Sequence, residues 1–137
     1  MGSLQNHWGA ALLFGIGVVA LLWPALVGAR VLLPSSVLYF IPPWTTQKPP
    51  DVTSYFNPVL SDVPTAYYPW WNYARESLRS WSVPQWNPYA LGGTPFYANA
   101  QTAFFSPFSL PLWVLPFKYA FGVAAAMRLW VTSFGTY

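Results

Sequence analysis

The 137-residue chain has no cysteine, one histidine and few charges: 7% of its residues are charged, against roughly 25% in a soluble globular domain. The absence of cysteine excludes a disulfide framework, a thiolate metal site and a cysteine nucleophile. His7 alone cannot build a histidine-rich metal site or serve a distributed triad. The net charge of +3 reflects a scarcity of acids rather than the basic stripe of a nucleic-acid-binding protein. We therefore expect no nucleic-acid partner.

Apolar and aromatic residues take the place of the missing charges. They make up 55% and 20% of the chain. Disordered chains are poor in aromatics and rich in charge, so the composition excludes disorder. The remaining class is a membrane protein or part of one, and we predict an all-α membrane protein with membrane lipids as its surroundings.

The first predicted transmembrane helix covers residues 8–30, after a short N-terminal tail at residues 1–7. No lysine, arginine, aspartate or glutamate precedes Arg30, and the apolar run exceeds the roughly 20 residues that a span needs. Pro24 is expected to bend or end the helix. A cleaved signal peptide is the alternative, but the absence of basic residues before the apolar run and its length favour an uncleaved signal anchor.

A loop rich in proline and aromatic residues is predicted between the spans, at residues 31–106. Fourteen of the fifteen prolines lie in residues 34–116, which prevents long helices and sheet interiors. The aromatic density distinguishes this segment from a flexible linker. We predict an ordered, irregular layer lying on a membrane surface.

One interfacial helix is predicted inside this loop, at about residues 64–80. Ser61 or Asp62 would provide its N-cap. An apolar stripe with steps of three and four residues indicates one helical face, made of Tyr67, Trp71, Ala74, Leu78 and Trp81. This face either lies in the membrane interface or packs on other protein segments.

The second membrane segment is predicted at residues 107–137, as short interfacial turns followed by a span from Tyr119 to Tyr137. Arg128 lies near the middle of that span. It either binds a lipid phosphate or snorkels to the interface. Because the span stops without a polar cap, we expect the chain to continue and this segment to be incomplete.

The distribution of basic residues gives only weak evidence for the side of the membrane on which the loop lies. Five of the six basic residues lie from Arg30, at the very end of the first predicted span, to Lys118, just before the span that starts at Tyr119. By the positive-inside rule they would place the loop in the cytoplasm. That rule is unreliable for loops longer than about 60 residues.

Several motifs occur in a fixed order from about Pro42 onward and carry a family resemblance. They are Asn57-Pro58-Val59-Leu60-Ser61-Asp62, Tyr68-Pro69-Trp70, Glu76-Ser77-Leu78-Arg79, Trp86-Asn87-Pro88-Tyr89, Gly92-Gly93-Thr94-Pro95-Phe96, Ala98-Asn99, Gln101-Thr102-Ala103, Arg128-Leu129 and Gly135-Thr136-Tyr137. In this order they resemble the N-terminal region of the YfhO-like family of bacterial multi-pass membrane proteins.

The resemblance implies a GT-C-like architecture in the bacterial cytoplasmic membrane, with the first loop extracytoplasmic. It implies a glycosyltransferase that moves a sugar from a polyprenyl-phosphate carrier to a cell-envelope polymer. The partners would be the lipid-linked donor, the acceptor polymer and the remaining helices of a longer chain. Alone, these 137 residues are expected to be inactive.

The resemblance also implies that Asp62 is the catalytic carboxylate. A general base at the membrane surface would take the proton of the acceptor hydroxyl; the alternative role of Asp62 is helix capping. No cofactor is assigned. One carboxylate does not make a metal site, so the sequence leaves undecided whether the reaction needs a divalent metal ion. The candidate substrate-binding residues are Tyr68, Arg75, Glu76, Arg79, Trp86, Asn87, Gly92, Gly93, Asn99, Gln101 and Arg128.

Most of these candidates have an ordinary structural alternative. Arg75 and Arg79 could hold the carrier phosphate or anionic lipid, and Glu76 could bind a hydroxyl or pair with Arg79. Trp86 could stack on a sugar, whereas the asparagines and glycines near it could simply set turns. The alternative function is a non-catalytic scaffold or transporter module whose surface loop binds lipid or a partner protein.

Overall fold

The computed structural model describes residues 2–52 and 57–137, and this part of the chain is mostly helical. Residues 53–56 of the predicted loop lie outside it. The elements in chain order are α1 (Gly2–Leu26), η1 (Ser35–Phe40), η2 (Trp44–Gln47), η3 (Pro58–Leu60), η4 (Val63–Tyr67), α2 (Tyr68–Arg79), β1 (Trp86–Asn87), β2 (Thr94–Pro95), η5 (Ala100–Thr102), η6 (Pro107–Ser109), α3 (Leu110–Val114) and α4 (Phe117–Gly135).

The elements form two compact units. The first joins Met1–Leu32 to Phe105–Tyr137, and the second is Leu33–Phe104. The second unit nearly coincides with the loop predicted at residues 31–106.

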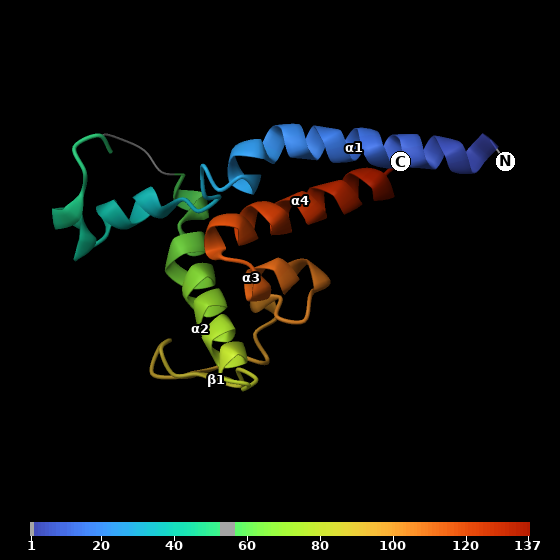
Figure 1. The fold of residues 1–137 in the computed structure, drawn as a ribbon. Coiled ribbons are helices and arrows are strands. Elements are labelled where there is room, and N and C mark those ends of the chain that lie inside the picture. The colour runs from blue at the N-terminus through green and yellow to red at the C-terminus, as the bar shows by residue number, and fades with distance from the viewer. Residues whose placement is uncertain (1, 53–56) are drawn as a thin grey trace. The chain divides into compact units, whose positions relative to one another are not determined.

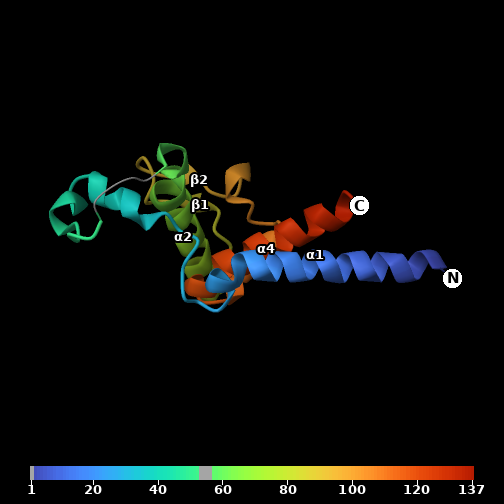
Figure 2. The same ribbon diagram turned by 90° about the horizontal axis from the view of Figure 1, so that it is seen from above.

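In the first unit, α1 and α4 lie side by side and run antiparallel (Figures 1 and 2). Gly122 of α4 is buried against the backbone of α1, where an added Cβ would lie 2.8 Å from the carbonyl oxygen of Ala25. This close approach depends on the absence of a side chain at Gly122.

Helix α1 is the one helix in the described part of the chain that is long and apolar enough to cross a membrane. Its apolar stretch is His7–Leu26, with a mean hydropathy of 2.1. The helix begins at Gly2, earlier than the predicted boundary at residue 8, and ends at Leu26 rather than residue 30. Pro24 removes a backbone donor in the last turn, and Gly28 then takes a left-handed φ of 73°.

The second predicted span corresponds to α4, which is helical over Phe117–Gly135. Unlike α1, this helix is not apolar enough to qualify as a span by composition, since Lys118 and Arg128 both lie within it. The turns predicted before it are η6 and the short helix α3, and Pro116 stands at the N-cap of α4.

In the second unit, π-helical η4 continues directly into α2. The segment after α2 folds back onto this helix through two aromatic side chains. The Tyr73 hydroxyl donates to the carbonyl oxygen of Trp86 (2.6 Å), and the Trp71 indole donates to that of Thr102 (3.2 Å). Prolines limit regular hydrogen-bonded structure in this segment, and these two side chains satisfy two of its carbonyl groups.

A minimal antiparallel hairpin, absent from the all-α prediction, lies within this segment. Strands β1 and β2 pair Trp86 with Pro95 and Asn87 with Thr94. Phe96, which directly follows β2, is 2% exposed, and its ring lies 5.4 Å from that of Tyr73. The aromatic residues of the loop therefore form a small core on one side of α2.

Candidate functional site

Helix α2 carries the residues from which a site can be built. Its predicted apolar stripe is present in part, because Ala74 is fully buried while Trp71 and Leu78 are half-buried. Trp81 does not belong to this stripe, contrary to the prediction: it is 99% exposed. The helix ends at Arg79, two residues before Trp81, so the helical spacing no longer applies there.

The end of α2 is a Schellman motif. The amide of Ser82 donates to the carbonyl oxygen of Ser77 (2.9 Å), and the amide of Trp81 donates to that of Leu78 (3.0 Å). Trp81 has a left-handed φ of 54° at the position that glycine usually occupies in this motif. The motif turns the chain so that Ser82 returns beside the helix.

A cleft of about 540 Å³ runs along α2 and this turn. Its volume falls within the range of roughly 300–1,000 Å³ that is typical of small-molecule sites. The lining residues come from one face of α2, from the turn after it and from the loop beyond: Pro69, Asn72, Tyr73, Glu76, Ser77, Ser80, Ser82 and Tyr89.

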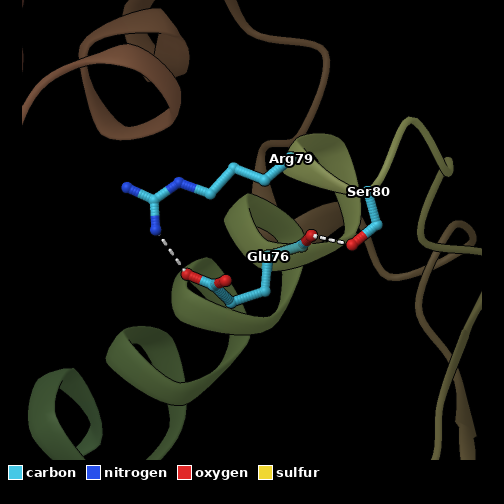
Figure 3. A network of polar contacts seen from close by, with 3 residues as sticks. All are labelled: Glu76, Arg79 and Ser80. Carbon is cyan, nitrogen blue, oxygen red and sulfur yellow. Dashed lines mark hydrogen bonds and ion pairs between the residues drawn. The ribbon is translucent and has the colours of Figure 1, made fainter.

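The acidic group of the cleft is Glu76 (Figure 3). Its Oε1 lies 2.7 Å from Nη1 of Arg79, and both side chains are more than half exposed. The Ser80 hydroxyl donates to the main-chain oxygen of Glu76 (3.0 Å). The charge of the carboxylate is thus balanced locally, as the ion-pair alternative for Glu76 predicted.

Two tyrosine rings form the aromatic part of the cleft. The rings of Tyr73 and Tyr89 meet edge to face, with their centroids 5.9 Å apart. The bond from Tyr73 to the carbonyl of Trp86 fixes the first ring, whereas Tyr89 is 84% exposed. A ligand in the cleft would therefore find one fixed and one accessible aromatic ring.

Three further polar side chains line the cleft, from Asn72, Ser77 and Ser82. Among the described residues, the side chains of Asn72, Ser77 and Ser82 make no hydrogen bond. A hydroxyl and a primary amide each offer both donor and acceptor capacity. The cleft thus presents hydrogen-bonding groups of both kinds beside an aromatic surface.

Asp62 lies at the start of the helical run formed by η4 and α2. Its prediction as a side-chain N-cap is wrong, because its carboxylate makes no capping hydrogen bond; its φ and ψ are already helical. Among the described residues this exposed carboxylate has no hydrogen bond or ion pair. At about 1.5 Å per residue, Asp62 and Glu76 are on the order of 20 Å apart along the helical axis. Asp62 therefore lies outside the cleft.

Arg75 was predicted to be able to hold the carrier phosphate or anionic lipid, which requires an accessible guanidinium. The structure instead buries it, with 6% of the residue exposed. Desolvation lowers the pKa of its guanidinium below the ordinary value, and Arg79 lowers it further, while Glu76 opposes the change. Burial removes Arg75 from the surface where a carrier phosphate would bind, and Arg79 remains exposed.

The predicted asparagines and glycines have local structural roles. The side-chain oxygen of Asn87, a buried residue, accepts from the amide of Tyr89 (3.0 Å), and that of Asn99 accepts from the amide of Gln101 (3.1 Å). Gly93 has a φ of 119°, and a Cβ there would lie 2.6 Å from the indole nitrogen of Trp86. The turn-setting alternative accounts for this geometry.

The other predicted site residues are spread over the chain. Tyr68 begins α2, Gln101 is exposed in η5, and Gly92 has a left-handed φ of 79° in the turn between the strands. Arg128 is exposed on α4, in the first compact unit. Of all the predicted residues, Glu76 alone lines the cleft.

Sequence reasoning missed the cleft, although a signal for it was present. Its helical members follow the spacing of one helical face, with steps of three, one, three, one and three residues from Pro69 to Ser80. The polar members of this face, Asn72, Glu76, Ser77 and Ser80, have helical periodicity in the sequence, as the residues of the predicted apolar stripe do. Ser82 and Tyr89 join only through the turn at Trp81, which no sequence pattern indicated.

No group of three or more metal-ligating side chains occurs in the described ranges, residues 2–52 and 57–137. No family model, curated protein or solved structure matches the chain. The resemblance to the YfhO-like family therefore stays a prediction, and the site has to be interpreted from its own chemistry.

Proposed function

We propose that the chain is the N-terminal part of a GT-C-like membrane glycosyltransferase of the YfhO-like kind. It would transfer a sugar from a polyprenyl-phosphate carrier to a cell-envelope polymer at the outer face of the bacterial cytoplasmic membrane. The observation that carries this proposal is the Asp62 carboxylate, which is exposed and, among the described residues, unbonded. A carboxylate engaged in capping or in an ion pair would be less available as a base.

The membrane setting of this proposal is supported by α1. Its 20-residue apolar stretch has a length of about 30 Å, matching the hydrocarbon thickness of a bilayer. Its antiparallel neighbour α4 would return through the membrane beside it, with Arg128 snorkelling to an interface. A lipid-linked sugar presents its head group at the membrane surface, and the predicted extracytoplasmic loop would bind that head group.

The reaction needs one proton acceptor on the protein. Asp62 would take the proton of an acceptor hydroxyl while that oxygen attacks the anomeric carbon of the donor sugar. The bond between that carbon and the phosphate oxygen breaks, and the polyprenyl phosphate leaves with the electron pair. The phosphate is already a competent leaving group, so the carboxylate base is the principal requirement.

One observation favours a second candidate, a module that binds a ligand without catalysis. The groups suited to ligand binding gather near the C-terminal end of α2, on the order of 20 Å from Asp62 along the helical run. In this alternative Asp62 has no chemical role, and the cleft is the whole functional site.

The two candidates are separated by replacing Asp62 in the gene's complete product. We expect Asp62→Asn to abolish one sugar modification of the envelope, measured by mass spectrometry of its glycans at unchanged membrane level. Asp51→Asn is the matched control, because Asp51 is also an exposed aspartate of the second unit. An unchanged profile in Asp62→Asn, where deletion of the gene does alter it, would favour the binding module.

A further inference from the structure

We propose that the cleft along α2 is a binding subsite for an uncharged sugar ring of a glycan. This proposal concerns binding alone and does not depend on sugar transfer at Asp62. It is carried by three properties of the cleft: its aromatic surface, its unused hydrogen-bonding groups and its balance of charge.

The aromatic surface is suited to the apolar face of a pyranose. Tyr89 is 84% exposed, although its ring packs edge to face on Tyr73. Tyrosine combines an apolar ring with a polar hydroxyl, and this combination suits a ligand that has C–H faces and hydroxyl edges. The contact with Tyr73 orients Tyr89 without covering it.

The hydrogen-bonding groups match the edges of such a ligand. A sugar hydroxyl donates one hydrogen bond and accepts others, as do the serine hydroxyl and the asparagine amide. Asn72 and Ser77 stand on the helical face of the cleft, and Ser82 is returned to it by the Schellman motif. Among the described residues, none of these three side chains is engaged in a hydrogen bond.

The charge of the cleft favours an uncharged ligand over a phosphate. Among the described residues, no lysine or arginine lines it, and the one acid that does, Glu76, is paired with Arg79 at 2.7 Å. An anionic group placed here would meet the Glu76 carboxylate, and the neighbouring cation, Arg79, is already paired with that carboxylate. A sugar hydroxyl, in contrast, can donate to a carboxylate oxygen, a charge-assisted bond that is stronger than a neutral one.

The test is saturation-transfer NMR on the complete chain in lipid nanodiscs, because detergents with sugar head groups would compete. The probe is a mixture of the methyl glycosides of glucose, galactose, mannose and N-acetylglucosamine. We expect saturation transfer to at least one of these glycosides. Binding of inorganic phosphate is followed separately by its ³¹P relaxation, and we expect none. No transfer to any of the four glycosides, or binding of phosphate in their place, would overturn the proposal.

Two matched pairs of variants locate the binding. Tyr89→Ala and Asn72→Ala should each weaken binding of the responding glycoside about five- to tenfold, as expected for the loss of one ring contact or one or two hydrogen bonds. Tyr97→Ala and Gln47→Ala remove a tyrosine ring and a side-chain amide at exposed positions of the second unit outside the cleft, and should leave the affinity unchanged. Equal losses in the cleft variants and their controls would contradict the assignment, and circular dichroism of each variant excludes unfolding as the cause.

Discussion

The indole nitrogen Nε1 of Trp130 donates a hydrogen bond of 2.9 Å to the main-chain carbonyl oxygen of Ala11. The two residues belong to α4 and α1 and lie 119 positions apart in the chain. Gly15, one turn beyond Ala11, leaves room for the indole, since a Cβ there would lie 3.5 Å from the same nitrogen. The bond ties the two antiparallel helices together at a backbone position.

Replacing this donor should weaken the helix pair. Trp130→Phe keeps an aromatic ring but removes the N–H, and we expect it to lower the free energy of unfolding by about 0.5–1.5 kcal/mol. Denaturant unfolding in mixed micelles measures the loss. Trp8→Phe is the control, because Trp8 lies on α1, is 73% exposed and makes no hydrogen bond among the described residues. A loss of equal size in both variants would contradict a specific role for the bond.

A side chain at Gly122 should separate the same two helices. An added Cβ would lie 2.8 Å from the Ala25 oxygen and 2.9 Å from its carbonyl carbon, and backbone cannot swing aside as a side chain can. We expect Gly122→Ala to lower the free energy of unfolding by about 1–3 kcal/mol. Gly17→Ala, where nothing lies within 4 Å of the new Cβ, should be neutral or stabilising. Comparison of the two unfolding curves measures the difference, and an undiminished stability of Gly122→Ala would refute this packing.

The left-handed backbone of Trp81 should carry a conformational cost. Trp81→Gly is expected to stabilise the second unit by about 1 kcal/mol, because glycine adopts this conformation freely. Trp81→Ala removes the same indole but keeps the cost, and should leave stability near that of the original chain. Thermal unfolding of each variant, followed by the helical signal in circular dichroism, distinguishes the two variants. Equal stabilities of Trp81→Gly and Trp81→Ala would show that the left-handed backbone at residue 81 carries no such cost.

The two arginines of α2 should differ sharply in their effect on stability. Arg75 is 6% exposed, so Arg75→Ala removes a buried stem and is expected to cost about 2–3 kcal/mol. Arg79 has a side chain that is 59% exposed, and Arg79→Ala should cost less than about 0.5 kcal/mol although it breaks the ion pair with Glu76. Arg75→Met, which retains an apolar stem, should lose less than Arg75→Ala. Denaturant unfolding gives all three values, and an Arg79→Ala variant as damaged as Arg75→Ala would contradict this assignment.

The sequence predicted those parts of the fold that depend on long periodic or apolar runs. The run that ends near Pro24 marked α1, and the apolar spacing marked α2, because each repeats one physical requirement over many residues. The start of α1 at Gly2 was missed because residues 2–6 lack a strong apolar signal. The hairpin at Trp86–Pro95 was missed because strands of two residues contain no alternation to detect.

The candidate site was harder to predict, because it depends on how α2 ends. The burial of Arg75 was not predicted, because the helical periodicity of α2 does not by itself specify which side chains are covered by tertiary packing. Ser82 lines the cleft after the chain turns at Trp81, which has the left-handed conformation that sequence statistics assign to glycine. The motifs Trp86-Asn87 and Gly92-Gly93 were predicted to bind substrate, and their geometry gives them local structural roles.

The most direct test of the proposed transferase is release of its leaving group. Vesicles containing the gene's complete product are incubated with lipid-linked sugars extracted from the source cells and with envelope polymer, and free polyprenyl phosphate is measured. Our account predicts release by the original protein, reduced about 10²–10⁴-fold in Asp62→Asn, the usual contribution of a general base. Equal release from the two proteins, or none from the original protein, would contradict it.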